Sequence, residues 1–429
     1  MKRSPLHHPA SQRQQRGAAA LIVTMVLFFA MTLAAAYVNR NLVFEQRISA
    51  NQYRATQAFE AAEAGLEWAL AQLNNPLKLE ADCRPGTSAQ AKTFRERYLG
   101  FDAASATHTP THWTQAAQTM ALQPTCVRSG TGWDCACPAS GHPSLAVPAQ
   151  TGSLAAFSIR FVKATQPGAL RVVADGCTSL AGACLPGSGS MPDATAQAQQ
   201  LVALVPGLAS APAAPLTAKD SVATSAALGL HNTDAASGGS VVHAGGAVTT
   251  PNARVSSVPG GVPSLAMASG DAALQGLSAN RFFSSFFGLD KDAWRRQPAV
   301  RTVVCEGVCN DALVQAASAG GGPTLLWVEG DVTLEGPLAL GTPGRPVMLL
   351  ARGAVRVAGP VVLHGLLHGS RIEWNDNGGG AGLLRGAATS ETSYAGSGAP
   401  DLFYDAAVLA VLKGNSGSFA RVPGSWRDF

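Results

Sequence analysis

Charged residues are scarce in this sequence. They make up 14% of its 429 residues, against roughly a quarter in an average globular protein, and the formal net charge is only +4. Lysine is sparse, and most of the basic excess lies in the first sixteen residues, at Lys2, Arg3, Arg13 and Arg16. Because nucleic-acid-binding proteins need an extended basic surface, this composition argues against that class. We expect no nucleic-acid partner.

The sequence also lacks the motifs of several large enzyme classes. No phosphate-binding G-x-x-x-x-G-K occurs, no G-x-G-x-x-G follows a predicted strand, and Gly414–Gly417 departs from the G-x-S-x-G of serine hydrolases. A carbohydrate-active enzyme needs clustered carboxylates. Residues 320–374 hold only a few of them: Glu329, Asp331, Glu335 and Glu373. We therefore expect no catalytic residue.

Metal-ligand patterns are equally weak. His364 and His368 lie in a segment that favours strands, where residues four apart are separated by roughly 13 Å, too far to share one ion. We expect these histidines to face solvent or to cap a strand. The run Asn375–Asn377 lacks the alternating acidic ligands and terminal Glu of a calcium loop. The sequence predicts neither a metal nor another cofactor.

One segment near the N-terminus carries no charge at all. Residues 18–39 read AAALIVTMVLFFAMTLAAAYVN, which meets the length of about 20 apolar residues that a membrane-spanning helix needs. The core of a secretory signal is shorter, about 7–15 residues, although the alanines at 34–36 could imitate its cleavage site. An ordinary signal anchor is a further alternative. The basic residues before the segment predict a cytoplasmic N-terminus.

The residues that follow continue the helical pattern outside the membrane. Residues 41–74 contain no Pro, no Gly precedes Gly65, and apolar residues recur at steps of three, four and seven. This pattern predicts one helix over 18–75, with its first half transmembrane and Pro76 beyond its end. Its outer half needs a partner surface. The residues expected to pack are Phe44, Ile48, Phe59, Leu66 and Leu73, with Ala55, Ala62 and Ala69 between them.

Three segments resemble the type IV pilin and pseudopilin superfamily. RGAAALIV (Arg16–Val23) resembles the leader junction, AFEAAEAGLEWAL (Ala58–Leu70) resembles the outer helix of PilX-type minor pilins, and VPGSWRDF (Val422–Phe429) resembles the end of some of these proteins. The resemblance implies that residues 1–17 are a prepilin leader. A prepilin peptidase would cut after Gly17, and Ala18 would then be N-methylated.

The chain departs from the major pilins at one position. Those proteins carry a Glu at mature position five, whereas counting from Ala18 places Ile22 there. A carboxylate in lipid is unfavourable unless it is paired. Ile22 therefore avoids the free-energy cost of a buried charge, but it also lacks the contact that this Glu is thought to make with the N-terminal amine of a neighbouring pilin. The resemblance therefore implies a minor pilin near the filament tip.

The eight cysteines all follow the apolar segment, and an even number outside the cytoplasm indicates disulfides. We expect local pairs Cys177–Cys184 and Cys305–Cys309. The remaining four can pair in three ways. They are Cys83, Cys126, Cys135 and Cys137.

The exposed part divides into two predicted regions. Residues 76–206 are expected to form a disulfide-stapled head, in which strands over 157–164, 169–177 and 196–206 make an antiparallel sheet that covers the helix. Residues 207–219 are rich in Pro and Ala and are expected to form a linker.

Residues 220–429 are Gly-rich, with short strands between turns, and predict an all-β domain. A sandwich, a barrel and a solenoid all fit this pattern, and the tight turns favour a solenoid-like domain. A helical insertion is expected at about 264–318, with Ser278 or Asn280 as a helix N-cap, and a mobile loop at 376–400. The predicted fold class is therefore α+β. Most large aromatic residues of this region are expected in its core.

The resemblance implies a role in type IV pilus assembly or priming, and hence in motility and cell adhesion. Implied partners are other minor pilins, the major pilin, a large tip adhesin, the prepilin peptidase and inner-membrane lipid. The precursor would lie in the bacterial inner membrane as a single-pass protein with a periplasmic C-terminus, and later in the pilus at the cell surface. Two alternatives stay open, a tip-capping pseudopilin of a type II secretion system and a membrane-anchored β-solenoid carbohydrate-active enzyme.

Overall fold

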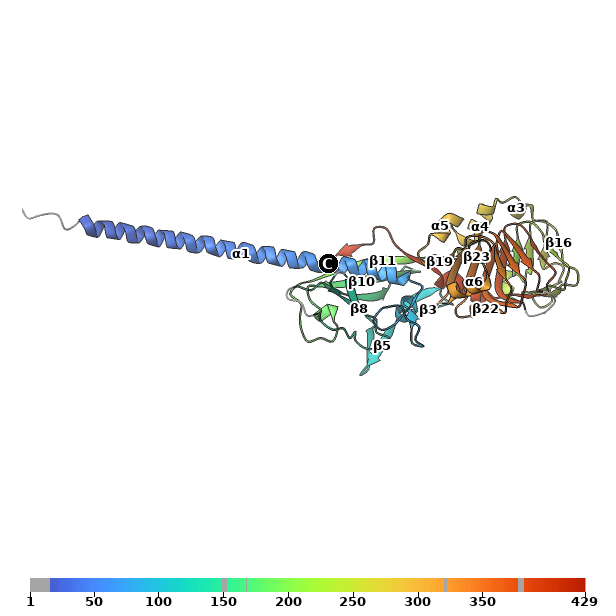
Figure 1. The fold of residues 1–429 in the computed structure, drawn as a ribbon, viewed down its shortest axis with the longest axis horizontal. Helices are drawn as coiled ribbons and strands as arrows, with labels where there is room; N and C mark the ends of the chain where they lie inside the picture. Colours follow the sequence, from blue (N-terminus) through green and yellow to red (C-terminus); the bar gives the residue numbers. More distant parts are fainter. Residues whose placement is uncertain are drawn as a thin grey trace, which may run out of the picture. The chain divides into compact units, whose positions relative to one another are not determined.

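A computed structural model describes residues 16–130, 132–148, 153–166, 168–319, 322–376 and 382–428. The expected leader therefore lies almost wholly outside the described residues. The chain divides into two compact units, residues 1–57 and 58–429. Helix α1 (Arg16–Leu73) provides the described part of the first unit and the beginning of the second, and confirms the expected long helix (Figure 1). It contains a stretch long and apolar enough to cross a membrane.

The second unit begins with a helix packed on an antiparallel sheet, as expected. Its strands follow the order β30-β11-β10-β9-β7-β8, and β31 also pairs with β11. The strand bounds are β7 (Thr125–Ser129), β8 (Gly132–Ala136), β9 (Ala156–Lys163), β10 (Ala169–Cys177), β11 (Thr195–Pro206), β30 (Gly417–Arg421) and β31 (Arg427–Asp428). We call this sheet, the end of α1 and the residues up to Pro206 the head.

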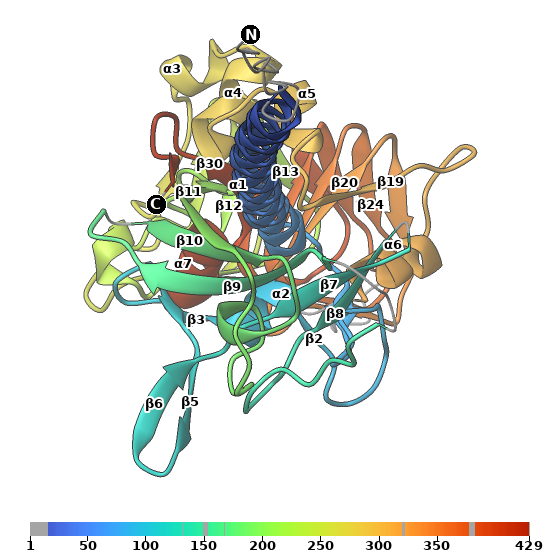
Figure 2. The same cartoon turned by 90° about the vertical axis from the view of Figure 1, so that its left-hand side faces the viewer.

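Short elements complete the head. The hairpin formed by β5 and β6 stands away from the main sheet (Figure 2). A capping box starts α2, because Thr93 Oγ1 accepts from the Glu96 N–H while the Glu96 carboxylate accepts from the Thr93 N–H. The bounds are β1 (Lys78–Leu79), β2 (Lys92–Thr93), α2 (Phe94–Tyr98), β3 (Leu99–Asp102), β4 (Thr107–Pro110), β5 (His112–Gln115) and β6 (Gln118–Ala121), with the 3₁₀ turn η1 (Gly182–Cys184).

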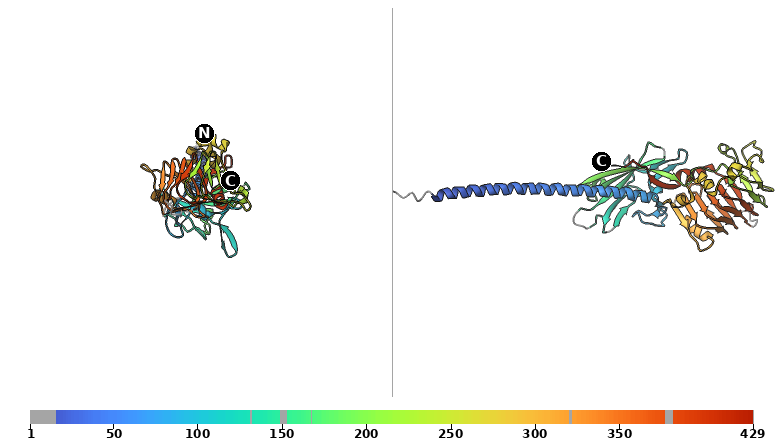
Figure 3. Two further views of the ribbon diagram at one scale, coloured as in Figure 1. Left: turned by 90° about the vertical axis from the view of Figure 1, so that its right-hand side faces the viewer. Right: turned by 90° about the horizontal axis from the view of Figure 1, so that it is seen from above.

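The remaining β-strands form a parallel β-helix, which specifies the solenoid-like fold expected from the sequence. The coils stack on one another, and strands of successive coils pair in parallel (Figure 3). The apolar side chains that point inward fill one continuous core. The strands are β12 (Leu216–Ala218), β13 (Val222–Thr224), β14 (Gly229–His231), β15 (Val242–Ala244), β16 (Val248–Thr249), β17 (Arg254–Ser256), β18 (Met267–Ala268), β19 (Val300–Val303), β20 (Thr324–Val328), β21 (Val332–Leu334), β22 (Leu338–Leu340), β23 (Val347–Ala351), β24 (Ala354–Val357), β25 (Val361–Gly369), β26 (Arg371–Trp374), β27 (Leu383–Ser390), β28 (Tyr394–Gly396) and β29 (Asp401–Tyr404).

The coils do not follow one another in chain order. Along one face the strands run β19-β20-β23-β25-β27-β12-β15-β18, so the chain enters the β-helix in its middle. Leu216 of the first strand pairs with Ala388 of a much later one. The connection between β18 and β19 holds α3 (Ala272–Gln275), α4 (Ala279–Phe287) and α5 (Lys291–Arg295). Further helical elements are η2 (Ala235–Ser237), α6 (Asp311–Ser318) and α7 (Ala406–Asn415).

The whole β-helix is inserted into the head sheet. Strand β11 ends at Pro206 and β30 begins at Gly417, and these two residues are direct partners in the antiparallel ladder. The prediction of one domain over 220–429 was therefore wrong at its end, because residues 417–428 return to the head. The expected linker over 207–219 was also wrong, since Leu208, Ala214 and Leu216 are fully buried.

Two other expectations need correction. Residues 383–390 and 394–396 of the expected loop form β27 and β28, because their backbone groups pair with neighbouring coils. Residues 377–381 lie outside the described residues. The expected helical insertion contains four helices, but the strands β18 and β19 also lie within it. Ser278 is the N-cap of α4 and accepts from the Arg281 N–H.

Candidate functional site

The end of α1 contacts the head sheet through very small residues. Ala58 and Ala62 are fully buried, and Gly65 lies against Phe157 and Ile159. A Cβ atom at Gly176 of β10 would lie 2.0 Å from the Ala58 carbonyl oxygen and 2.4 Å from the Ala62 nitrogen. The helix backbone therefore rests directly on the strand, and the orientation of α1 on the sheet depends on the missing side chain.

The five predicted packing residues divide into two groups. Leu66 and Leu73 are buried on the sheet, and Phe59 is half-buried with its ring edge-on to Trp426 at 6.1 Å. Phe44 and Ile48, in the first unit, are 49% and 57% exposed, so their packing partner stays a prediction. The sequence argument missed Gly65 and Gly176. The alanines on the predicted stripe were the available signal that the helix packs unusually close.

The segment before the C-terminus is attached to the outer helix. Arg421 forms an ion pair with Glu67, and Ser425 Oγ accepts from the Leu201 N–H at 3.1 Å. The ring contact between Trp426 and Phe59 extends this attachment. Two segments noted for their resemblance to pilins, Ala58–Leu70 and Val422–Phe429, thus lie together in one structure.

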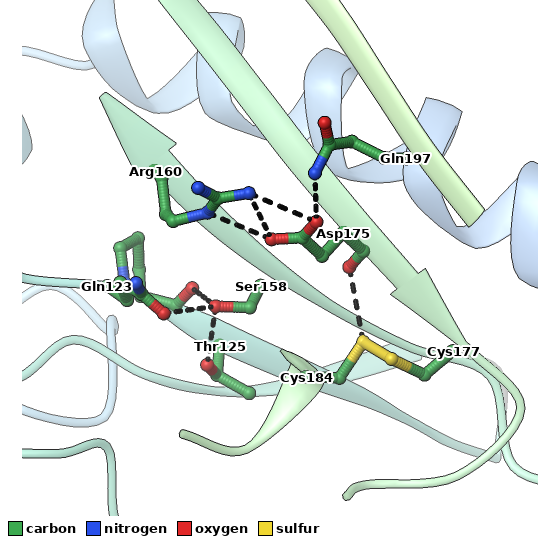
Figure 4. A network of polar contacts seen from close by, with 9 residues as sticks. Gln123, Thr125, Ser158, Arg160, Asp175, Cys177, Cys184 and Gln197 are labelled. Carbon is green, nitrogen blue, oxygen red and sulfur yellow. Dashed lines mark hydrogen bonds and ion pairs between the residues drawn. A yellow bond between two sulfur atoms is a disulfide. The ribbon is translucent and has the colours of Figure 1, made fainter. Parts of the chain in front are cut away.

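The sheet face opposite α1 carries a polar network (Figure 4). Arg160 binds the Asp175 carboxylate with two nitrogens, at 3.0 and 3.2 Å, and Gln197 Nε2 donates to the same carboxylate at 2.7 Å. Asp175 is 8% exposed, so each of these bonds offsets the cost of burying its charge. Because the three residues come from β9, β10 and β11, the network favours one strand register.

Three disulfides close loops in the head, and a fourth lies in the β-helix. All eight cysteines are paired, as Cys83–Cys137, Cys126–Cys135, Cys177–Cys184 and Cys305–Cys309. The two expected local pairs are present, and the structure selects one of the three possible connectivities for the other four. Arg97, 6% exposed, donates to the carbonyl groups of Leu79, Glu80 and Cys137 and holds the long Cys83–Cys137 loop in place.

Two carboxylates of the β-helix, Glu329 and Asp331, are held by arginines. Burial alone would raise the pKa of Glu329, but hydrogen bonds and charge from Arg295 and Arg352 lower it overall. The Ala354 N–H and Arg356 lower the pKa of Asp331. A glycosidase acid needs a raised pKa. Ionised, paired carboxylates suit a structural role.

The histidine pair and the serine motif also have structural surroundings. His368 is 1% exposed, with Nδ1 2.9 Å from Thr389 Oγ1 and Nε2 3.0 Å from Glu391 Oε1. The expectation that it faces solvent or caps a strand was wrong, because Lys291 of α5 pairs with Glu391 and seals this site. Ser416 is buried and donates to the Leu412 carbonyl group. Within the described residues, no three His, Cys, Asp or Glu side chains group to hold a metal ion.

A chain of Ser, His and Asp crosses three strands of the β-helix. Ser256 Oγ lies 3.0 Å from His231 Nδ1, and His231 Nε2 lies 3.0 Å from Asp401 Oδ1. The sequence argument missed this arrangement because the three residues are far apart in the chain. Arg254 also binds Asp401, at 2.6 Å, and already compensates the charge that a catalytic triad uses to stabilise its imidazolium.

Comparisons with known proteins concern mainly the N-terminal segment. Residues 16–67 match the family described as PilX N-terminal, which confirms the resemblance over that segment. Among solved structures, the competence-associated pilin ComZ from Thermus thermophilus matches at 13% identity, over 88% of this chain and 98% of that chain. Its TM-score of 0.24 is too low to support a conclusion. No curated protein matches the chain.

Proposed function

We propose that this chain, whose residues 16–67 are a PilX-type N-terminal segment, is a minor pilin that takes part in type IV pilus assembly. The observation that carries the proposal is the continuity of α1 from an uncharged apolar stretch into the family-matched helix that packs on the head sheet. Such a helix can anchor the precursor in a membrane and later pack among the helices of a filament. The contribution is assembly and not catalysis.

The first step would be processing at Gly17. The peptidase would cut between Gly17 and Ala18, and the new N-terminus would begin the apolar helix. Exposed Phe44 and Ile48 would then contact the helices of other minor pilins and the major pilin, replacing lipid contacts. The rest of the chain would lie in the periplasm until the filament is extended to the cell surface.

The insertion supports the proposal of a position at or near the tip. Residues 207–416 lie between two paired strands of the head, so the β-helix adds bulk at one site without interrupting the helix–sheet contact. A domain of this size at every position would crowd a filament shaft. At a tip its strand edges and loops would be open to a large adhesin.

Two alternatives remain weaker. A tip-capping pseudopilin of a type II secretion system would share α1, but the added domain of such proteins is usually mostly helical, whereas this one is a parallel β-helix. A carbohydrate-active enzyme would need a carboxyl group of raised pKa. The pKa values of Glu329 and Asp331 are lowered.

The test is the N-terminal sequence and intact mass of the membrane-extracted protein, with and without co-expressed prepilin peptidase. We expect peptidase-dependent cleavage that leaves Ala18 first, and its loss in Gly17→Val. The matched control is Gly65→Ala, which should be cut normally. An uncut chain in the presence of active peptidase, or a start near Ala36, would refute the proposal.

A second measurement is the abundance of this chain, relative to the major pilin, in secreted-protein fractions and in sheared pili. A minor pilin should appear in sheared pili well below the major pilin. Uniform labelling of the shaft at equal abundance would contradict the tip position while leaving the pilin assignment intact. Hydrolysis of polysaccharides by the full chain would instead favour the enzyme.

A further inference from the structure

A cavity of about 290 Å³ lies where the β-helix joins the head. Its walls come from the end of α1, from α2 and β3, and from the β19 and β20 strands. The volume is at the lower end of the range for small-molecule sites, roughly 300–1,000 Å³. All of these elements belong to the second compact unit. The cavity can therefore hold a small molecule that touches both the head and the β-helix.

The lining carries an excess of positive charge. It includes the cationic residues Lys92, Arg95, Arg301 and Arg345. The acidic residue of the lining is Glu96, and one of its oxygens already serves the capping box of α2. The lining therefore holds four cationic side chains against one carboxylate, in a chain in which only 14% of residues are charged.

The positive charge of Arg95 is surrounded by backbone carbonyl groups and not by a carboxylate. Its guanidinium donates to the carbonyl oxygens of Leu73, Asn415 and Gly417. Among the described residues no carboxylate lies within ion-pair distance of it. Burial lowers the pKa of Arg95 to about 10, since the charged form loses hydration there. A bound anion would compensate this charge.

Other arginines of the lining keep donors that could reach an anion. Arg301 donates to the carbonyl groups of Pro76 and Ala317, and within the part of the chain that the structure describes its Nη2 keeps a second N–H without a partner, whereas its Nε is buried away from the cavity surface. Arg345 uses Nε to bind Glu96 at 3.1 Å. Its two Nη nitrogens form the fork that suits phosphate oxygens.

We propose that this cavity binds a phosphate-class oxyanion, held by Arg95, Arg301 and Arg345. The anion is either inorganic phosphate or the phosphate group of a small phosphorylated molecule. Arginine forks bind such groups through paired charge-assisted hydrogen bonds. Since Arg95 belongs to the head and the other two arginines to the β-helix, the bound anion holds the two parts together. The inference is independent of the assembly role proposed above.

The test is calorimetric titration of the full-length chain in detergent with inorganic phosphate, and separately with glycerol phosphate, at constant ionic strength set by chloride. We expect saturable binding of at least one of them. Arg345→Gln should weaken it about ten- to a hundredfold, as expected when one charge-assisted contact of about 1.5–3 kcal/mol is lost. Tighter binding of glycerol phosphate would identify a phosphorylated molecule, and equal or weaker binding would identify free phosphate.

Arg352→Gln is the matched control. Arg352 is also a half-exposed arginine of the β-helix that pairs with one glutamate, and it is not part of the cavity lining. It should leave the affinity within about twofold. No saturable binding of either probe, or equal affinity in the wild type and a correctly folded Arg345→Gln variant, would overturn the proposal. Unchanged circular dichroism establishes that the variant is folded.

Discussion

Adding one methyl group at Gly176 should loosen α1 from the head. In Gly176→Ala the new Cβ would lie 2.0 Å from the Ala58 carbonyl oxygen and 2.4 Å from the Ala62 nitrogen. Both contacted atoms are backbone, so no side-chain rotation can relieve the clash. Overpacking costs typically about 1–3 kcal/mol. The contact with the helix backbone places this variant at the upper end, and the lower entropy of the unfolded alanine chain offsets about 0.4–1 kcal/mol.

We therefore expect a net loss of about 2 kcal/mol, which corresponds to a decrease in Tm of roughly 5 °C for a domain of a few hundred residues. The assay is thermal unfolding of the full-length protein in detergent, followed by circular dichroism and by protease resistance of the head. The control is Gly132→Ala in β8, where nothing lies within 4 Å of the added Cβ. It should unfold at or slightly above the wild-type temperature. Equal stability of the two variants would refute the close helix–sheet contact.

Three further predictions concern a buried histidine, two of the disulfides and the insertion. Burial and the nearby Arg95 lower the pKa of His108 to about 4, although the hydrogen bond with Asn415 opposes the shift. Below pH 6.5 the unfolded chain therefore binds this proton more tightly than the folded chain does. The free energy of unfolding should be highest above pH 6.5 and fall by about 3 kcal/mol as the pH drops towards 4. Denaturant titrations of His108→Gln at several pH values should show a smaller fall in this free energy. If the free energy of unfolding of His108→Gln depended on pH as that of the wild type does, His108 would not be the source of the pH dependence. The Cys83–Cys137 bond closes a separation of 54 residues and Cys305–Cys309 one of 4. Paired Ser substitutions should thus cost about 4 and about 2 kcal/mol in the chain-entropy model; the reverse order in denaturant unfolding would contradict it. Replacing residues 208–415 by a short turn should preserve the three head disulfides in mass spectra, because Pro206 and Gly417 are already paired; scrambled disulfides would show that the head requires its insertion.

Local patterns predicted individual elements well. The alternation over 157–164, 169–177 and 196–206 located β9, β10 and β11 within a residue or so, because side chains along a strand alternate between two faces. Ser278 was one of two expected N-caps, since a hydroxyl before a helix can accept from a free backbone N–H. Neither pattern contains information about which distant strand becomes a neighbour.

The candidate site was predictable only in part. The long helix depends on contiguous residues, as does the proposed processing junction, and the burial of Leu66 and Leu73 followed from helical spacing. The cavity arginines come from distant segments and carry no common spacing, so the sequence offered no signal for them. The sequence pattern places His368 on an ordinary half-exposed strand. Its burial depends on Lys291 and Glu391, which reach it from an inserted helix and another coil.

The sequence by itself determined the apolar stretch, the long helix, three strands of the head sheet and the two local disulfides, because each depends on residues within a few positions of one another. Tertiary structure alone decided that the β-helix is inserted between Pro206 and Gly417, that its first strand pairs Leu216 with Ala388, and that Gly176 touches the helix backbone. These features arise from pairing and packing between distant segments. The free energy of these contacts depends on which distant segments pair and pack together. The periodicity within any one segment does not contain this information.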